Sequence, residues 1–238
     1  LRSFIMRLDK FLCKSTDLDR DAASVAIING SVTVNGAIAT DCAMQVHENN
    51  AVCLNEKPLM PRPSRYFMLH KPADTLCSNV DGAYPSLFHL LDIEHAFDLH
   101  IVGRLDADTT GLVLLTDDGR WSFNIISPQY QCEKVYRVTL RDPLDSEATA
   151  AIAATFAAGL QLQGETALTL PATLQQVDEK TVLLTLTEGK FHQVKRMFAA
   201  VGNKVVALHR AQIGAVTLDV DVGEWRELTL AEIASFTA

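Results

Sequence analysis

The chain has 238 residues, of which 48% are hydrophobic and 21% are charged. This is the composition of an ordinary globular protein with one large domain or two smaller ones. No apolar run approaches the roughly 20 residues of a transmembrane helix, and no signal-peptide pattern opens the chain, so we expect no membrane association. The formal net charge of −8 argues against a protein that coats nucleic acid through overall positive charge.

The cysteines and histidines favour a cytoplasmic protein without a metal site. An odd number of cysteines with no CxxC pair argues against a disulfide framework or a zinc ribbon, and is typical of a reducing compartment. The five cysteines are Cys13, Cys42, Cys53, Cys77 and Cys132. Seven histidines are present without HExxH spacing. We therefore expect no metal and no cofactor.

The chain begins with a small α/β module, which we place at residues 6–57. Apolar residues have helical spacing in "RLDKFL", and a second helical stretch covers residues 20–29. The segment "SVTVNGAIA" alternates around Asn35-Gly36, which is a strong two-residue hairpin signal. A further strand is expected over 51–54. We set aside the five residues before Met6 as an added or upstream segment.

A proline-rich segment separates this module from the rest of the chain. "KPLMPRPS" predicts a semi-stiff linker, which we place at residues 58–65. Beyond it, strands are expected at "RYFMLHKP", "GLVLLTDDG", "KVYRVTL", "TVLLTLTEG", "KVVALHR" and "AVTLDV", and helices near 121–126, 146–157 and 191–201. Because strands outnumber helices without a βαβ rhythm, residues 66–238 predict an α+β domain on a mixed, mainly antiparallel sheet.

One segment of this acidic chain contains no acidic residue. From Gly189 to Leu218 there are five cations, namely Lys190, Lys195, Arg196, Lys204 and Arg210. Chance clustering is one explanation. The other is a positive wall that faces a polyanion.

The stretch "GRLDADTTGLVLLTDDG", residues 103–119, places one arginine and four aspartates around an apolar run. Asp106 lies in a tight turn at a strand edge. An aspartate there is either a turn-forming residue or a nucleophile that a cation keeps ionised in a partly dry cleft. Asp108 and Thr109 resemble turn-forming residues more than Asp106 does. The pair Asp117-Asp118 is interpreted as part of a turn.

Two later segments supply candidate partners for Asp106. On a helical wheel the apolar stripe of the last predicted helix consists of Phe191, Val194, Phe198 and Val201. Lys195 lies at the edge of this stripe, where it either pairs with a carboxylate or snorkels from a core helix. Arg196 points away and is better placed to meet solvent or phosphate. Tyr136 in "KVYRV" is either a core residue with its hydroxyl at the rim or a ring that stacks on a displaced base.

A competing motif overlaps the same aspartate. "DADTT", residues 106–110, matches the DxDx[TV] pattern of haloacid-dehalogenase-like magnesium phosphatases. That pattern requires an unbroken apolar strand immediately before the first aspartate. Gly103 and Arg104 interrupt the strand here, so the spacing alone is weak evidence.

Several long motifs, in one order, resemble a known family. "GRLDADTTGLVLLTDDG" is similar to the GRLDxxTxGLLLLTxDG signature of pseudouridine synthases that act on ribosomal RNA. "EKVYRV", "EGKFHQVKRMF", "LHRAQIGAVTL" and "GEWRELTLAEI" resemble the later motifs. "RLDKFL" and "INGSVTVNG" look like an S4 RNA-binding domain. The phrases "RYFMLHKP" and "HQVKRMFAAVGN" are most similar to the small-subunit branch, which implies the isomerisation of uridine 516 of 16S rRNA to pseudouridine.

The resemblance implies roles for individual residues. Asp106 matches the nucleophilic aspartate, Tyr136 the tyrosine that packs on the base, and Lys195 the basic partner of the aspartate. Arg104 matches the arginine that holds the RNA backbone where the base is flipped out, which costs on the order of a few kcal/mol. Further RNA contacts are expected from Arg196, Lys71, Arg210, Arg7, Lys10 and Arg20. The partner is expected to be 16S rRNA or a small-subunit assembly intermediate, bound by a monomer.

Two departures from the family pattern bear on RNA binding. The usual NKPxG reads His70-Lys71-Pro72-Ala73-Asp74, so a glycine near the cleft is missing. In the S4-like helix the usual Ser-Arg reads Asp19-Arg20, and residues 7–56 carry four Lys or Arg against seven Asp or Glu. Strong independent RNA binding by this module is therefore in doubt. Two alternatives stay open: a non-catalytic rRNA-binding or assembly factor, and a synthase of the large-subunit branch.

Overall fold

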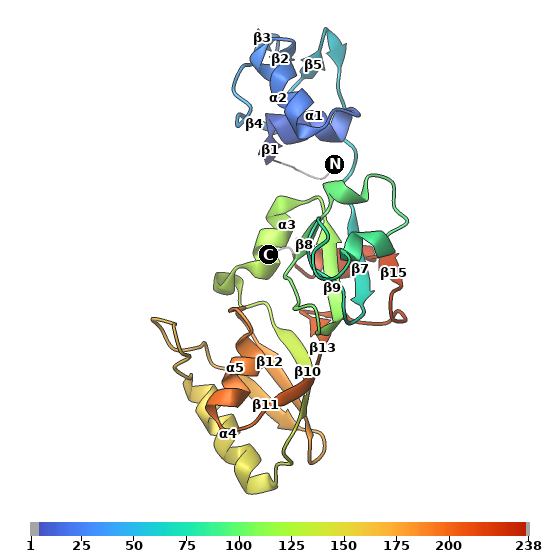
Figure 1. Ribbon diagram of the computed structural model, residues 1–238. Helices are drawn as coiled ribbons and strands as arrows, with labels where there is room; N and C mark the ends of the chain where they lie inside the picture. The colour runs from blue at the N-terminus through green and yellow to red at the C-terminus, as the bar shows by residue number, and fades with distance from the viewer. Residues whose placement is uncertain (1–4, 237–238) are drawn as a thin grey trace. The chain divides into compact units, whose positions relative to one another are not determined.

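The structure is a computed structural model that describes residues 5–236 of the chain (Figure 1). The segment set aside before Met6 lies outside the described residues except for Ile5, and so do the last two residues of the predicted catalytic domain. The chain divides into two compact units, which meet in the sequence between Pro63 and Ser64. Each unit has its own hydrophobic core.

The first unit consists of two helices and short antiparallel strands. Its elements are β1 (Ile5–Arg7), α1 (Leu8–Ser15), α2 (Arg20–Ile28), β2 (Val32–Val34), β3 (Ala37–Ile38), β4 (Gln45–His47), β5 (Val52–Leu54) and β6 (Lys57–Pro58). The predicted hairpin is confirmed, because β2 pairs with β3 and both Asn35 and Gly36 have positive φ. Asp19 caps α2 by accepting a hydrogen bond from the amide of Ala22. Ile5 pairs with His47, so the segment set aside contributes a strand residue.

The predicted linker packs largely as part of the first unit. Pro58 lies in β6, where it is the partner of Cys53, and the amide of Leu59 donates to Val52. The Arg62 guanidinium donates to the carbonyls of Cys13 and Lys14. These are the orphan carbonyls at the end of helix α1, and a cation is a favourable partner for them. The segment 58–63 therefore packs on the first unit, which its proline content alone did not reveal.

The second unit is an α+β domain around one large sheet. Its strands are β7 (Tyr66–Lys71), β8 (His100–Val102), β9 (Thr110–Thr116), β10 (Lys134–Leu140), β11 (Thr173–Gln176), β12 (Thr181–Leu186), β13 (Val205–Ile213), β14 (Val216–Thr217) and β15 (Trp225–Glu227). Its helices are α3 (Gly119–Ile126), α4 (Ser146–Ala158), α5 (Gln193–Ala200) and α6 (Leu230–Ala234), with 3-10 turns at Leu87–Leu90, Ala96–Asp98 and Pro128–Tyr130. The predicted α+β class and mainly antiparallel sheet are confirmed. β8, β11, β15 and α6 were not predicted.

The sheet runs in the order β11-β12-β10-β13-β9-β7-β15 (Figure 1). Every pairing is antiparallel except that of β13 with β9, which joins only His209 to Thr110 and Arg210 to Gly111. At this junction a Cβ on Gly111 would lie 2.3 Å from the Arg210 carbonyl oxygen, and Gly111 has φ +111°. Only glycine allows the two backbones to approach so closely.

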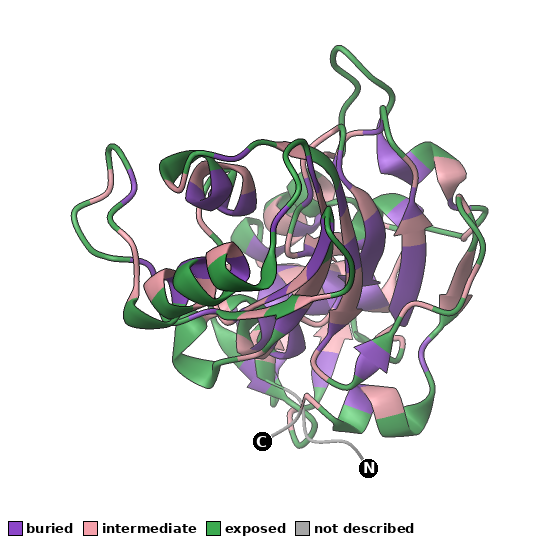
Figure 2. Ribbon diagram, turned by 90° about the horizontal axis from the view of Figure 1, so that it is seen from below, coloured by how far each residue is buried: buried purple, intermediate pink, exposed green. Residues whose placement is uncertain are grey.

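The apolar strands β7 and β9 are buried on both faces, which explains their unbroken hydrophobic sequences. On one face Met68 and Leu114 pack with Trp121 of α3, whereas on the other Leu69 and Val113 pack against the turn that contains Leu87. A third cluster covers β10 and β12 with α4 and α5. In Figure 2 the strands of this unit are drawn mostly in the colours of buried and intermediate residues. The core thus fixes the strand ends from which the functional loops emerge.

The loop after β7 retains a left-handed residue where the family pattern has glycine. Asp74 has φ +57°. Aspartate tolerates this left-handed conformation, but its backbone is more strained there than that of glycine. Replacing Asp74 with glycine is expected to raise the free energy of unfolding by about 0.5–1 kcal/mol. Urea unfolding measures this change, with Asp74→Ala as the comparison, which is expected to be destabilising because alanine avoids positive φ.

Candidate active site

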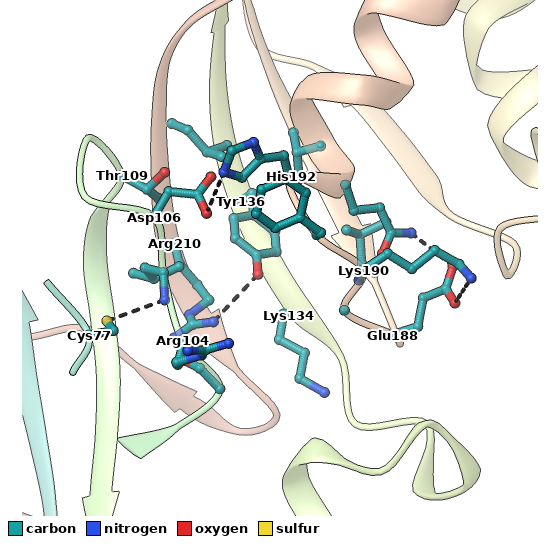
Figure 3. Close-up of a pocket in the computed structure, with 18 of the residues that line it drawn as sticks. Cys77, Arg104, Asp106, Thr109, Lys134, Tyr136, Glu188, Lys190, His192 and Arg210 are labelled. Atoms are coloured by element: carbon teal, nitrogen blue, oxygen red, sulfur yellow. Dashed lines mark hydrogen bonds and ion pairs between the residues drawn. The ribbon is translucent and has the colours of Figure 1, made fainter. Parts of the chain in front are cut away.

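A cavity of about 780 Å³ lies in the second unit beside the junction of β9 and β13. The loop 103–107, the start of β10 and the segment 186–195 contribute to its lining. Figure 3 shows Asp106, Tyr136 and His192 close together in this space, with Arg104 beside them. Residues from three separate parts of the sequence therefore meet at one site.

The loop that carries Asp106 is anchored by its apolar neighbours. Val102 and Leu105 are buried, and the Leu105 amide lies 3.3 Å from the Cys77 sulfur. Burial raises the pKa of the Cys77 thiol, so this group stays protonated. The amide of Thr109 donates to the Asp106 carbonyl over 3.1 Å and closes a tight turn. The predicted turn is present, and its buried residues hold Asp106 at the cavity wall.

Two buried cations hold the same loop from opposite sides. Lys71 on β7 is 0% exposed and its ammonium donates to the carbonyls of Pro72, Ala107 and Thr109 over 2.8–3.0 Å. Burial lowers the pKa of Lys71. We predicted that Lys71 contacts RNA, and this is wrong, because no face of the side chain reaches solvent.

Arg210 on β13 is the second of these cations. It is 2% exposed and donates to the carbonyls of Leu112 and Gly103 over 2.8 and 2.7 Å. It also lies 3.5 Å from the Tyr136 hydroxyl. Arg210 lines the cavity, but its guanidinium is committed to the protein backbone. The prediction of an RNA contact is therefore replaced by a structural contact that positions Gly103 and Tyr136.

The Asp106 carboxylate has two cationic or potentially cationic neighbours. Lys195 Nζ lies 3.1 Å from Asp106 Oδ2, and His192 Nε2 lies 3.4 Å from Oδ1. The carboxylate is 30% exposed, so it is partly desolvated yet reachable from the cavity. The two side chains therefore place an amine and an imidazole directly against the carboxylate. The helical wheel selected Lys195, whereas His192 was missed because a lone histidine carries no spacing signal.

A second carboxylate shares the same lysine. Lys195 Nζ lies 2.7 Å from Asp108 Oδ1, and its hydrogen bond lowers the pKa of Asp108. Burial opposes the charged form of Lys195, but hydrogen bonds to Asp108 and Asp106 outweigh it and raise the pKa of this lysine. Asp108 was interpreted as a turn former. It also fixes the ammonium beside Asp106.

Tyr136 and Arg104 complete the wall of the cavity. Tyr136 lies on β10 between Leu184 and Arg210 on the neighbouring strands, and its ring is partly exposed toward the cavity. Arg104 follows β8 and is exposed at the cavity lining. Within residues 5–236, no acidic side chain lies within ion-pair distance of Arg104. Its charge is therefore available to a bound anion.

Arg196 is partly exposed and also makes several contacts within the protein. Its guanidinium lies 2.8 Å from Glu165 Oε1 and donates to the carbonyls of Phe191 and Gln163. Hydrogen bonds from Arg196 and Lys190 lower the pKa of Glu165. Arg196 thus joins helix α5 to the loop around Glu165, a contact that no local sequence pattern indicates, and its contact with RNA stays a prediction.

Helix α5 begins two residues later than predicted. His192 is its N-cap and has φ +47°, so the helix starts at Gln193. Phe191 therefore falls outside the apolar stripe and is 75% exposed, which makes the prediction of a core position wrong. Val194 and Phe198 are buried as predicted, and Met197 completes the stripe.

The residues predicted to bind RNA in the first unit lie at its surface. Arg7 pairs with Asp9 at 2.6 Å, and Arg20 is exposed at the first position of α2. Lys10 is partly buried on α1. The pairing with Asp9 offsets the charge of Arg7, which agrees with the acidic composition of this unit.

Within the described part of the chain, no helix is both long and apolar enough to cross a bilayer. Among the same residues, no three or more His, Cys, Asp or Glu side chains gather as a metal site.

Comparison with known proteins identifies the family of this chain. A model of the family described as RNA pseudouridylate synthase matches residues 65–200, which is more than half of the chain. The chain therefore belongs to the family of RNA pseudouridylate synthases, and the resemblance drawn from the motifs is confirmed. This family also excludes the magnesium phosphatase suggested by "DADTT".

Individual relatives cover almost the entire chain. The ribosomal small subunit pseudouridine synthase A of Pasteurella multocida is 48% identical over 234 residues, which is 97% of this chain and 99% of the relative. The protein of the same name from Escherichia coli (strain K12) is 48% identical over 233 residues, again with 97% and 99% coverage. A solved structure described as a pseudouridylate synthase is 45% identical, covers 98% of this chain and 100% of its own, and has a TM-score of 0.70.

Proposed function

We propose that this protein converts uridine 516 of 16S rRNA to pseudouridine, with Asp106 as the nucleophile. The observation that carries the proposal is the Asp106 carboxylate at the wall of a cavity, with Lys195 Nζ 3.1 Å from one oxygen. Relatives over nearly the full length are named for the small ribosomal subunit, which supports this RNA as the substrate.

The reaction needs a nucleophile but no redox step. The bond from N1 of the base to the ribose is broken, the base turns, and C5 is joined to the ribose in its place. The hydrogen on C5 leaves as a proton, and N1 gains one. Asp106 attacks the nucleotide during this sequence, and the Lys195 ammonium lies against its carboxylate at 3.1 Å. Tyr136 packs on the detached base, whose flat faces suit an aromatic ring.

The first unit serves as an S4-like accessory domain with weak RNA affinity. Its surface cations Arg7, Lys10 and Arg20 contact the RNA backbone, but acidic residues outnumber basic ones in this unit. Each missing phosphate contact reduces both affinity and salt dependence. The natural substrate is 16S rRNA or a partly assembled subunit, which the protein meets as a cytoplasmic monomer.

Tritium release tests the proposal. We expect the protein to free tritium from 16S rRNA labelled at C5 of its uridines, and reverse-transcription mapping of the product to locate one pseudouridine at position 516. Product at another 16S position would correct the site, and product only in 23S rRNA would assign the large-subunit branch. Binding of rRNA without tritium release would instead support a non-catalytic assembly factor.

Arg104 is expected to hold a backbone phosphate beside the flipped nucleotide. Replacing Arg104 with glutamine should raise KM about tenfold, because one charge-assisted hydrogen bond is lost. The slope of log KM against log salt should fall by about 0.7–0.9, the contribution of one phosphate. Arg120→Gln is a matched control, since Arg120 is an exposed arginine on α3 outside the cavity lining. An equal change in both variants would argue against a specific contact.

A further inference from the structure

An exposed phenylalanine at the cavity is stacked on a histidine of the active site. The rings of Phe191 and His192 lie 3.8 Å apart between centroids and only 21° from parallel. Both residues line the cavity, and His192 also contacts Asp106 at 3.4 Å. The His192 ring therefore lies between Phe191 and the nucleophile, and Phe191 forms the next part of the cavity lining.

The backbone holds this pair away from the core. His192 is left-handed, with φ +47°, a conformation that is uncommon for residues other than glycine, although histidine, asparagine and aspartate adopt it more often than the rest. A helical residue at this position would continue α5 and place Phe191 on the stripe with Val194. Instead Phe191 is 75% exposed and gains little from burial. A strained turn that exposes an aromatic ring is typical of a functional segment.

The cations around Phe191 are already paired with carboxylates. Lys190 lies 3.2 Å from Glu165, which also pairs with Arg196, and Lys195 is held by Asp106 and Asp108. Neutralised cations release few counterions when RNA binds. Contact with RNA on this side of the cavity must therefore depend on the exposed ring rather than on charge. Aromatic rings bind bases of any sequence, because each base has a π face.

We propose that Phe191, supported by His192, is a stacking platform for the base of a nucleotide that flanks the target uridine. The inference rests on the proposed function and deepens it by naming a second base-binding subsite. The target base must reach Asp106 and Tyr136, whereas Phe191 lies outside them, behind His192. One face of the Phe191 ring is covered by His192, and its exposure leaves the other for a base.

Steady-state kinetics with an rRNA fragment that contains the mapped uridine test the platform. Phe191→Leu, which retains an apolar side chain but has no π face, is expected to raise KM about 5- to 150-fold, whereas Phe191→Trp should keep KM near the wild-type value. The KM ratio should be the same at low and high salt, because no charge is removed. Phe97→Leu is the control, since Phe97 is also exposed and stacked on a ring but lies outside the cavity lining.

A direct readout uses 2-aminopurine placed in the fragment next to the target uridine. Stacking on Phe191 should quench its fluorescence when wild-type protein binds, and Phe191→Leu should relieve the quenching at saturating protein. Unchanged KM and unchanged fluorescence in Phe191→Leu would overturn the platform while leaving the synthase assignment intact. A wild-type protein that binds the fragment but forms no pseudouridine would overturn both. Because Phe191 is exposed, its replacement should leave the melting temperature unchanged, which excludes misfolding as a cause.

Discussion

Replacing Asp106 with asparagine is expected to abolish pseudouridine formation, with turnover lowered by at least about a thousandfold. The amide has nearly the same shape as the carboxylate but has no negative charge with which to attack the nucleotide. The loop should keep its conformation, because its anchors are Leu105, Lys71 and Arg210 rather than the Asp106 side chain. Tritium release under single-turnover conditions, with excess enzyme, measures the chemical step directly.

Asp108 provides the comparison for this variant. Asp108→Asn removes the other carboxylate on Lys195 but leaves Asp106 Oδ2 with its contact at 3.1 Å. Asp108→Asn should therefore lose about tenfold at most, since it affects only the placement of the ammonium. Both variants should bind 16S rRNA with nearly wild-type affinity. Turnover by Asp106→Asn within tenfold of wild type would remove Asp106 from the role of nucleophile.

The pairing of Asp106 with Lys195 could be inferred from the sequence, because each residue has a strong local pattern. Asp106 lies in a glycine-bounded turn before an apolar strand, and Lys195 lies at the edge of a helical stripe. Neither pattern gives a distance, and the 3.1 Å contact depends on the β9 and β13 junction. The motif order identified the family.

The wrong predictions of RNA contacts have a common physical cause. Lys71 and Arg210 are cations near the site, and in the sequence a cation near a polyanion site indicates a phosphate contact. Whether a cation faces solvent or carbonyl oxygens depends on strands and loops far away in the sequence. Lys71 meets the carbonyls of residues 107 and 109 across the sheet, and Arg210 meets that of residue 103. Such contacts leave no mark in the local composition.

Phe191 was misplaced for a different reason. A helical wheel assumes regular helical geometry at every residue. It therefore cannot represent a left-handed residue such as His192, which breaks that geometry. Because glycine is the usual signal for positive φ, a histidine in that conformation gives no warning in the sequence. The error concerned one residue, yet it placed a base-stacking candidate in the core.

Lys71→Met is expected to lower both stability and turnover. The three N–H donors of the ammonium match three carbonyl acceptors, and methionine would leave these buried oxygens unpaired. The free energy of unfolding should fall by about 3 kcal/mol. Because two of the three carbonyls lie just after Asp106, at positions 107 and 109, the nucleophile should also shift, and a displacement of about 1 Å can cost 100-fold in rate. Urea unfolding and single-turnover tritium release measure the two effects.

Arg65→Met is a control that distinguishes a loss of protein stability from a displacement of Asp106. Arg65 directly precedes the same strand, β7, and its guanidinium donates to Asp117 and to the carbonyls of Glu94 and His95, all outside the cavity lining. This variant should also unfold at lower urea concentration, because it removes the guanidinium that pairs with the mostly buried Asp117 carboxylate at 3.0 Å. At a temperature where both variants are folded, only Lys71→Met should turn over slowly. If the two variants lost turnover equally, or if Lys71→Met unfolded like wild type, the Lys71 ammonium would not be what holds the Asp106 loop in place.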